Sequence, residues 1–152
     1  MGKLVNVLHR MGFDEGYDTT YGADLTIVEE SEEFLQRLES GENLPLLTSC
    51  CPAWGSMVKR LFPDQRENIS MALTPMVLTG RIIKRLHPGC KVAFICPCAA
   101  KKLEAGRRTI RSDIDFVLTF EEVNGMFEAK NVDFKSLPDD HHMHGASGDG
   151  RR

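Results

Sequence analysis

Features that mark several large classes of protein are missing from this sequence. No apolar run approaches the roughly 20 residues that a helix needs to cross a bilayer. The N-terminal stretch MGKLVNVLHRMGFDEG lacks the long apolar core and the small-residue cleavage site of a secretory signal. A net charge of −3 provides no basic excess for binding nucleic acid. We therefore expect a cytoplasmic protein that binds neither membranes nor nucleic acid.

The cysteine pattern lacks the signals of disulfides and of structural zinc. All five cysteines stand in the middle third of the chain, at Cys50, Cys51, Cys90, Cys96 and Cys98. An odd number with two adjacent members makes a poor disulfide framework, and the paired C-x-x-C knuckles of a closed zinc site are absent. In a reducing compartment, the roles that remain are metal ligation, catalysis and burial.

The hydrophobic pattern predicts one α/β domain within the 152 residues. Apolar periodicity, bounded by Gly and Pro, predicts helices at 3–11, 23–40, 52–62, 72–86 and 121–130. Short apolar runs predict strands at 44–49, 91–96 and 114–119. Strands separated by helices favour right-handed crossovers, and so a twisted parallel sheet flanked by helices.

Two further segments carry definite expectations. The predicted helix at 23–40 has an apolar stripe that includes Ile27, Phe34, Leu35 and Leu38, and Gly41 is expected to end it. Residues 136–152 show no periodicity and predict a loop or tail without a strand. Their histidines at 141, 142 and 144 are typical of a solvated loop rather than a metal site. Because the chain stops within a Gly-rich loop, we expect missing sequence or a partner chain.

Two cysteine-bearing loops follow predicted strands, at residues 48–52 and 96–98. The carboxyl ends of parallel strands share one sheet edge, where ligands bind, so these thiols converge if the strands are neighbours. Thiolates in such loops suit an iron–sulfur cluster or zinc. Adjacent cysteines rarely chelate one metal, so Cys50 and Cys51 are expected to have different roles. Spacing alone leaves a metal site and buried or redox cysteines about equally open.

The residues in these loops resemble a known family. TSCCPAW (48–54) resembles the first signature of the FeFe-hydrogenase large subunit, and PCAAKKLE (97–104) resembles the second. The flanking segments ADLTIVEE (23–30), DIDFVLT (113–119) and the closing ASGDGRR are also similar to that family. The resemblance implies that residues 1–152 form the first lobe of a hydrogenase catalytic domain.

The resemblance also implies a role for each cysteine of the two loops. Cys51 and Cys98 would bind the 4Fe–4S part of the H-cluster, and Cys50 would pass protons to its two-iron part. Lys101 would donate a hydrogen bond to a cyanide ligand there. Cys96 and Pro97 would lie over the two-iron site; Cys96, which replaces the Met of the best-known members, would either line the pocket or serve as packing.

The family's proton path can also be transferred to this sequence. Glu30, Ser70 and Glu33 occupy the relay positions that lead to Cys50, and Arg37 stands beside the outer end. Without the resemblance, the acidic run that contains both glutamates would predict a solvated helix face.

Two further residues are expected to have structural roles. Cys90 is expected to be buried, and Trp54 is expected to pack against the core beside the first loop.

The family's third signature, which supplies two further cysteines, is absent, as is the stretch that precedes residue 1 in longer members. This chain alone is therefore expected not to evolve hydrogen. The leading interpretation is a fragment or split subunit of an FeFe-hydrogenase, completed by a second lobe or partner chain and served by a ferredoxin-like electron carrier. The alternative is a hydrogenase-like iron–sulfur sensory or cluster-assembly protein without hydrogen turnover.

Overall fold

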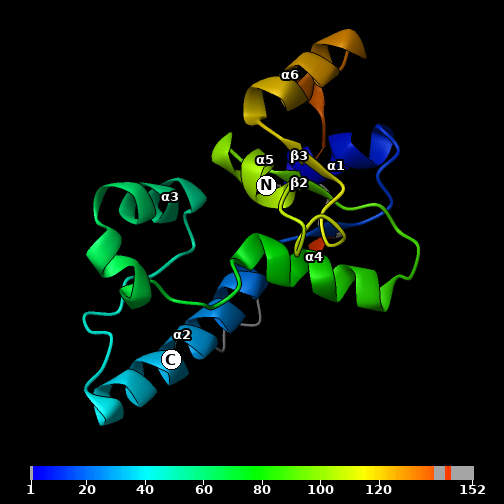
Figure 1. Ribbon diagram of the computed structural model, residues 1–152. Helices are drawn as coiled ribbons and strands as arrows, with labels where there is room; N and C mark the ends of the chain where they lie inside the picture. Colours follow the sequence, from blue (N-terminus) through cyan, green and yellow to red (C-terminus); the bar gives the residue numbers. More distant parts are fainter. Residues whose placement is uncertain (1, 139–142, 145–152) are drawn as a thin grey trace.

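The computed structural model describes residues 2–138 and 143–144, and its core is a layered arrangement of helices around a short parallel sheet (Figure 1). Strands β2 (Ala93–Ile95) and β3 (Phe116–Leu118) pair in parallel. Helix α4 (Pro75–Leu86) packs on one face, in a cluster that includes Met76 and Val92. Helices α1 (Gly2–Arg10) and α6 (Phe120–Ala129) cover the other face. This confirms the predicted α/β architecture of a parallel sheet flanked by helices.

A second pair of parallel strands lies apart from the first. Strand β1 (Gly16–Tyr17) pairs with β4 (Met143–His144), and no hydrogen-bonded ladder joins this pair to β2 and β3 among the described residues. The expectation of no strand in 136–152 is therefore wrong at 143–144. A two-residue strand carries too little sequence to show the period-2 alternation on which strand prediction depends. The histidines at 141 and 142 lie outside the described residues.

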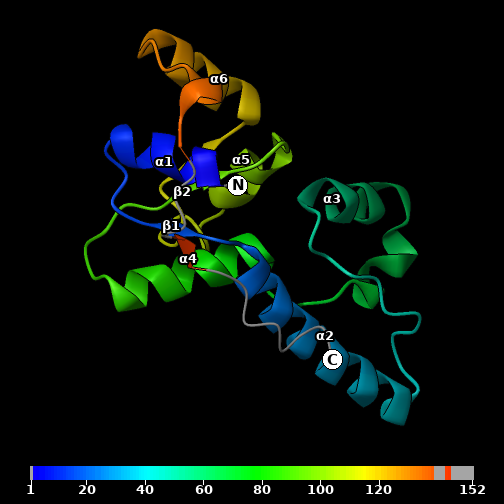
Figure 2. The ribbon, with the colours of Figure 1, turned by 180° about the vertical axis from the view of Figure 1, so that it is seen from behind.

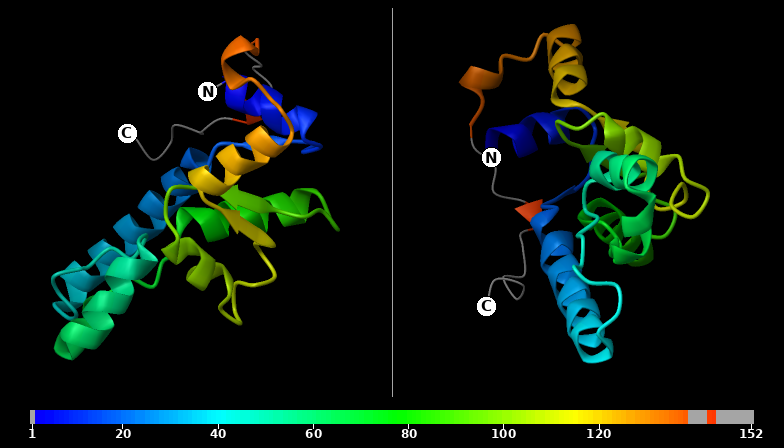
Figure 3. Two further views of the ribbon diagram at one scale, coloured as in Figure 1. Left: turned by 90° about the horizontal axis from the view of Figure 1, so that it is seen from above. Right: turned by 60° about the vertical axis from the view of Figure 1, so that its left-hand side comes forward.

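Helix α2 (Thr20–Ser40) extends away from the sheet as a long arm (Figures 1 and 3). Gly41 ends it in the left-handed conformation, with φ of 72°, and its N–H bonds the Arg37 carbonyl. Near the other end, Gly22 permits close contact with α4, because a Cβ there would lie 2.5 Å from the Pro75 carbonyl oxygen. Only this first part of α2 is buried, at Gly22, Asp24 and Thr26.

The apolar stripe of α2 is largely exposed in the described part of the chain. Its four apolar side chains are between 42% and 59% exposed, at Ile27, Phe34, Leu35 and Leu38. The helix has the predicted periodicity, but it leaves the sheet layers after its first two turns, so the stripe has no sheet or helix against which to pack.

Helix α3 (Pro52–Leu61) continues through Phe62 into the 3₁₀ helix η1 (Pro63–Asn68), and a second 3₁₀ helix, η2 (Phe134–Ser136), follows α6. The predicted strand at 44–49 is absent, apart from an isolated parallel bridge between Leu47 and Ile69. The carbonyls of Asn43 and of residues 67–69 instead accept hydrogen bonds from the Arg37 guanidinium, at 2.8–3.3 Å. The sequence predicted that backbone hydrogen bonds of a sheet would fix this segment. The Arg37 side chain fixes it instead. No described helix is both long and apolar enough to span a bilayer.

Candidate functional site

The first cysteine loop ends at the N-terminus of α3. Cys51 is the N-cap residue, its Sγ accepts a hydrogen bond from the Trp54 N–H at 3.4 Å, and Pro52 occupies the first helical turn. Both Cys50 and Cys51 are exposed. Because a helix N-terminus favours negative charge, this position would stabilise a metal-bound thiolate at Cys51.

The second cysteine loop leads into the short helix α5 (Ala100–Ala105), which lies in contact with α3. Cys98 is partly buried just before this helix. The Lys101 ammonium donates to the backbone carbonyl of Cys50 at 3.0 Å. One hydrogen bond therefore joins the first loop to the helix that follows the second, some fifty positions along the sequence, and it holds the cation beside the adjacent cysteines.

Glu104 is a component of this site that the sequence reasoning missed. Its side chain is only 2% exposed, and its Oε2 accepts from the Lys101 ammonium at 2.7 Å. Lys101 itself is 13% exposed, so the pair is shielded from water. A signal for Glu104 was available, since residues three apart on a helix share one face and can form an ion pair. A buried carboxylate requires such a partner, because an unpaired charge in the interior is costly.

Glu33 of α2 is the centre of a polar network with Ser70, Met71 and Arg37. The Ser70 hydroxyl donates to its Oε2 at 2.7 Å, the Met71 N–H donates to the same oxygen at 3.3 Å, and Arg37 pairs with Oε1. Partial burial would raise the pKa of Glu33, but the hydrogen bonds from Ser70 and Arg37, with the charge of Arg37, lower this pKa below its ordinary value. The carboxylate is therefore ionised at neutral pH and can accept a proton.

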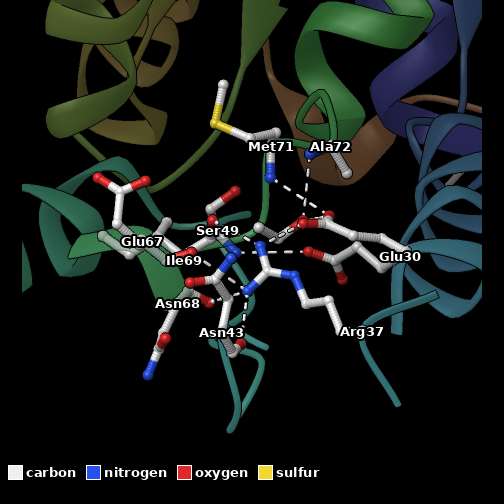
Figure 4. Close-up of polar contacts among 11 residues, drawn as sticks. Glu30, Arg37, Asn43, Ser49, Glu67, Asn68, Ile69, Met71 and Ala72 are labelled. Carbon is white, nitrogen blue, oxygen red and sulfur yellow. Dashed lines mark hydrogen bonds and ion pairs between the residues drawn. The ribbon is translucent and has the colours of Figure 1, made fainter. Parts of the chain in front are cut away.

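Glu30 lies one helical turn away and faces the first cysteine loop. Its Oε1 accepts from the Ser49 N–H at 3.4 Å, next to Cys50 (Figure 4). Within the described part of the chain, no hydrogen bond joins Glu30 to Ser70 or to Glu33. The network thus has two segments: one that links Ser70 to Glu33 and Arg37, and one that links Glu30 to the cysteine loop.

A cavity of about 490 Å³ connects these elements. Its lining includes Ser49, Cys51, Ser70, Ala72, Glu104 and Arg107. The first cysteine loop, the serine of the Glu33 network and the buried glutamate of α5 therefore border one space. Such a space, with thiol, hydroxyl, carboxylate and cationic groups, can hold a polar or metal-containing group and exchange protons with it.

The other singled-out residues have the following surroundings. Cys96 is 7% exposed, and its thiol lies 3.5 Å from the Cys98 carbonyl, whereas Pro97 is exposed. Met76 is fully buried in the core beneath the sheet. Cys90 is partly buried against the same cluster, which agrees with a packing role. Trp54 is 38% exposed, so the expectation that it packs against the core is wrong; its backbone N–H instead donates to the Cys51 thiol.

A four-iron cluster is held by four cysteine ligands. The two candidate ligands of this chain would therefore need two more. Among residues 2–138 and 143–144, no group of three or more His, Cys, Asp or Glu side chains is arranged to bind a metal ion. The residues present nevertheless fit part of such a site: a capped exposed thiol at Cys51, a second thiol at Cys98, and a fixed cation at Lys101 that suits an anionic metal ligand.

The chain is similar to proteins described as hydrogenases and to one described as an Fe-S cluster assembly factor. The NADP-reducing hydrogenase subunit HndD of Solidesulfovibrio fructosivorans is 38% identical over 91% of this chain, and the aligned part is 27% of that protein. The structure of apo FeFe-hydrogenase HydA1 from Chlamydomonas reinhardtii superposes with a TM-score of 0.82 at 31% identity, covering 92% of this chain and 39% of that one. The cytosolic Fe-S cluster assembly factor NAR1 of Scheffersomyces stipitis is 27% identical over 91% of this chain.

This chain therefore spans well under half the length of the relatives it matches. The sequence model of the family described as "Iron only hydrogenase large subunit, C-terminal domain" matches all of residues 1–152. The chain belongs to the iron-only hydrogenase large-subunit family.

Proposed function

We propose that this chain forms one lobe of an FeFe-hydrogenase active site, with Cys51 and Cys98 as ligands of the 4Fe–4S part of the H-cluster. The observation that carries the proposal is the hydrogen bond from Lys101 to the Cys50 carbonyl, which joins the first cysteine loop to the helix that follows the second. The parent reaction is reversible: two protons and two electrons form dihydrogen. A second lobe or partner chain completes the ligand set, and a ferredoxin-like protein in the cytoplasm exchanges the electrons.

In this proposal, the bound cluster supplies the electrons and the place at which dihydrogen forms, and the residues of this chain deliver protons. Glu33, ionised at neutral pH, takes a proton from the surface near Arg37 and exchanges it through the Ser70 hydroxyl. Glu30 then receives the proton at the first cysteine loop and passes it to Cys50. The Cys50 thiol donates the proton to the reacting group. Transfer from the first segment to the second needs a small movement or a water molecule, since no hydrogen bond joins Glu30 to Ser70 among the described residues.

Lys101 has a different task. Its ammonium lies between Glu104 and the Cys50 carbonyl, with little exposure to water. In such surroundings, a fixed cation stabilises an anionic ligand of the cluster more strongly than it would in water. Cys96 and Pro97, which precede Cys98 in the sequence, would lie over the two-iron part of the cluster.

The test is reconstitution of the full chain with iron, sulfide and the two-iron precursor under anaerobic conditions, with and without the remaining part of a relative's catalytic domain. We expect stable iron binding, infrared bands of carbonyl and cyanide ligands, and hydrogen evolution only in the mixture. Cys51→Ser should abolish iron binding there, whereas Cys90→Ser, which removes a thiol distant from both loops, should not. Equal iron content with and without the added part would contradict the proposal.

The similarity to the assembly factor NAR1 supports a second candidate function, an iron–sulfur assembly or sensory protein. In that case, the reconstituted mixture should give 4Fe–4S signals without carbonyl or cyanide bands. Cys50→Ala separates the two functions, because it should stop turnover in a hydrogenase and leave the cluster of an assembly or sensory protein unchanged.

A further inference from the structure

Glu104 carries a buried carboxylate that has no part in the proton path. Its side chain is 2% exposed and borders the cavity of about 490 Å³ that Cys51 also lines. Helix α5, which carries Glu104, lies between the sheet and α3 (Figure 2). A carboxylate in such a place is costly unless it is paired. Its partner is the Lys101 ammonium at 2.7 Å, so the pair belongs to the candidate site.

The Lys101 ammonium makes two hydrogen bonds, to two different parts of the chain. It donates to Oε2 of Glu104 at 2.7 Å and to the Cys50 carbonyl at 3.0 Å. An ammonium has three donors, so one N–H is left. With a single hydrogen bond, the flexible four-carbon stem of a lysine could approach its acceptor from several directions. Two acceptors in different directions prevent this, and they fix the direction of the third N–H.

Glu104 can hold Lys101 in this way because both lie on one face of α5. Residues three apart on a helix are neighbours, and the two side chains are 13% and 2% exposed. The next lysine provides a contrast, since Lys102 pairs with Glu122 of α6 and these side chains are 41% and 45% exposed. Of the two pairs, the one at Lys101 is shielded from water and contacts a cysteine loop, which favours a role at the site.

We propose that Glu104 is a positioning residue, which aims the remaining N–H of Lys101 at an anionic ligand of the cluster beside Cys50. This inference deepens the proposed function and rests on it for the identity of the ligand. Glu104 acts through Lys101 and need not touch the cluster. It keeps the donor in place before the cluster is present, so that no reorientation is needed when the anionic ligand binds.

Two substitutions at this position separate positioning from packing. Glu104→Gln keeps the size of the side chain but replaces the charged acceptor with a neutral one, which weakens the bond to Lys101. Glu104→Asp keeps the charge on a side chain that is one methylene shorter. A packing role predicts that Asp, which leaves a void, disturbs Lys101 at least as much as Gln. Positioning by charge predicts that Asp preserves Lys101 better. Glu122→Gln, which removes the partner of the neighbouring lysine, is the matched control.

The first measurement uses the whole chain without a cluster. The hydrogen-exchange rate of the Lys101 ammonium is followed by NMR with isotope-labelled lysine, well below the melting temperature of each variant. We expect this rate to rise about tenfold or more in Glu104→Gln, as for loss of a charge-assisted hydrogen bond, and by less in Glu104→Asp. It should not change in Glu122→Gln. An unchanged rate in Glu104→Gln, or an equal rise in both variants of Glu104, would overturn the proposal.

The second measurement uses the reconstituted mixture, at equal iron content for each variant. The infrared bands of cyanide should shift and broaden in Glu104→Gln, in the same direction as in Lys101→Met, and lie closer to their unmodified positions in Glu104→Asp. Unshifted cyanide bands in Glu104→Gln would contradict the inference. Failure of the proposed function has a different sign, because the mixture with the unmodified chain would then lack these bands. The ligand assigned to Lys101 would fall with it, while the exchange rates decide separately whether Glu104 positions the ammonium.

Discussion

The buried ion pair between Lys101 and Glu104 allows a quantitative prediction for Glu104→Gln. The substitution keeps the shape of the side chain but removes its charge, so the shielded ammonium loses its carboxylate partner. Breaking a buried pair in this way costs about 3–5 kcal/mol. We expect the lower end, about 3 kcal/mol, because Lys101 keeps its hydrogen bond to the Cys50 carbonyl.

For a domain of this size, that loss corresponds to a fall of about 6–12 °C in the melting temperature, measured by calorimetry. The adjacent pair Lys102–Glu122 provides a matched control, since its side chains are 41% and 45% exposed. Glu122→Gln removes the same charge at the surface while Gln can still bond the Thr119 N–H, so its melting temperature should not change measurably.

A second substitution separates the ion pair from general packing. Adding Lys101→Met to Glu104→Gln removes both charges, and the double variant should be more stable than Glu104→Gln alone. Lys101 should also react faster with an amine acylating reagent in Glu104→Gln than in the unmodified chain, as measured by mass spectrometry. An unchanged melting temperature in Glu104→Gln, or an equal fall in Glu122→Gln, would refute the reasoning.

Three further outcomes are expected. In the reconstituted mixture, Cys50→Ala should retain iron by elemental analysis and lose at least about 99% of hydrogen evolution, as expected for loss of a positioned proton donor. Ser70→Ala removes a hydrogen bond to Glu33, so the pKa of Glu33 should rise, which NMR titration can measure, and turnover should slow. Burial would raise the pKa of Asp115, but hydrogen bonds led by that from Lys84 lower it from 3.8 to about 2. This carboxylate therefore stabilises the fold fully above pH 3.8 and loses its contribution as pH falls through about 2, so Asp115→Asn should flatten acid unfolding in that window.

The sequence was a good guide where a local signal decides the structure. Pro52 begins α3 and Gly41 ends α2 as predicted, because a proline fits the first helical turn and a glycine accepts the left-handed conformation. The predicted strands at 91–96 and 114–119 contain β2 and β3, although each observed strand is shorter. These elements depend on residues within one or two turns, which a linear pattern records well.

Long-range contacts explain what the sequence did not predict. The run at 44–49 has the composition of a strand, yet the Arg37 side chain binds the carbonyl of Asn43, just before it, and that of Asn68, next to the residue that bridges with Leu47. Glu104 was overlooked because a carboxylate in a basic segment suggests a surface ion pair, and only the fold reveals that α5 turns it inward. In both cases, the deciding feature is how one element is placed against the rest of the fold, which the local pattern does not specify.

The exposed stripe on α2 has a related explanation. Hydrophobic periodicity predicts that one face of a helix is covered, but it does not identify the polypeptide that covers it. Large apolar side chains also remain exposed on α3 and after it, at Met57, Leu61 and Phe62. Exposed apolar surface of this extent is typical of an interaction site. Since α2 and α3 also carry Glu30, Glu33 and Cys51, a lobe that covered these side chains would lie next to the proposed cluster ligands and could supply the thiols that this chain does not.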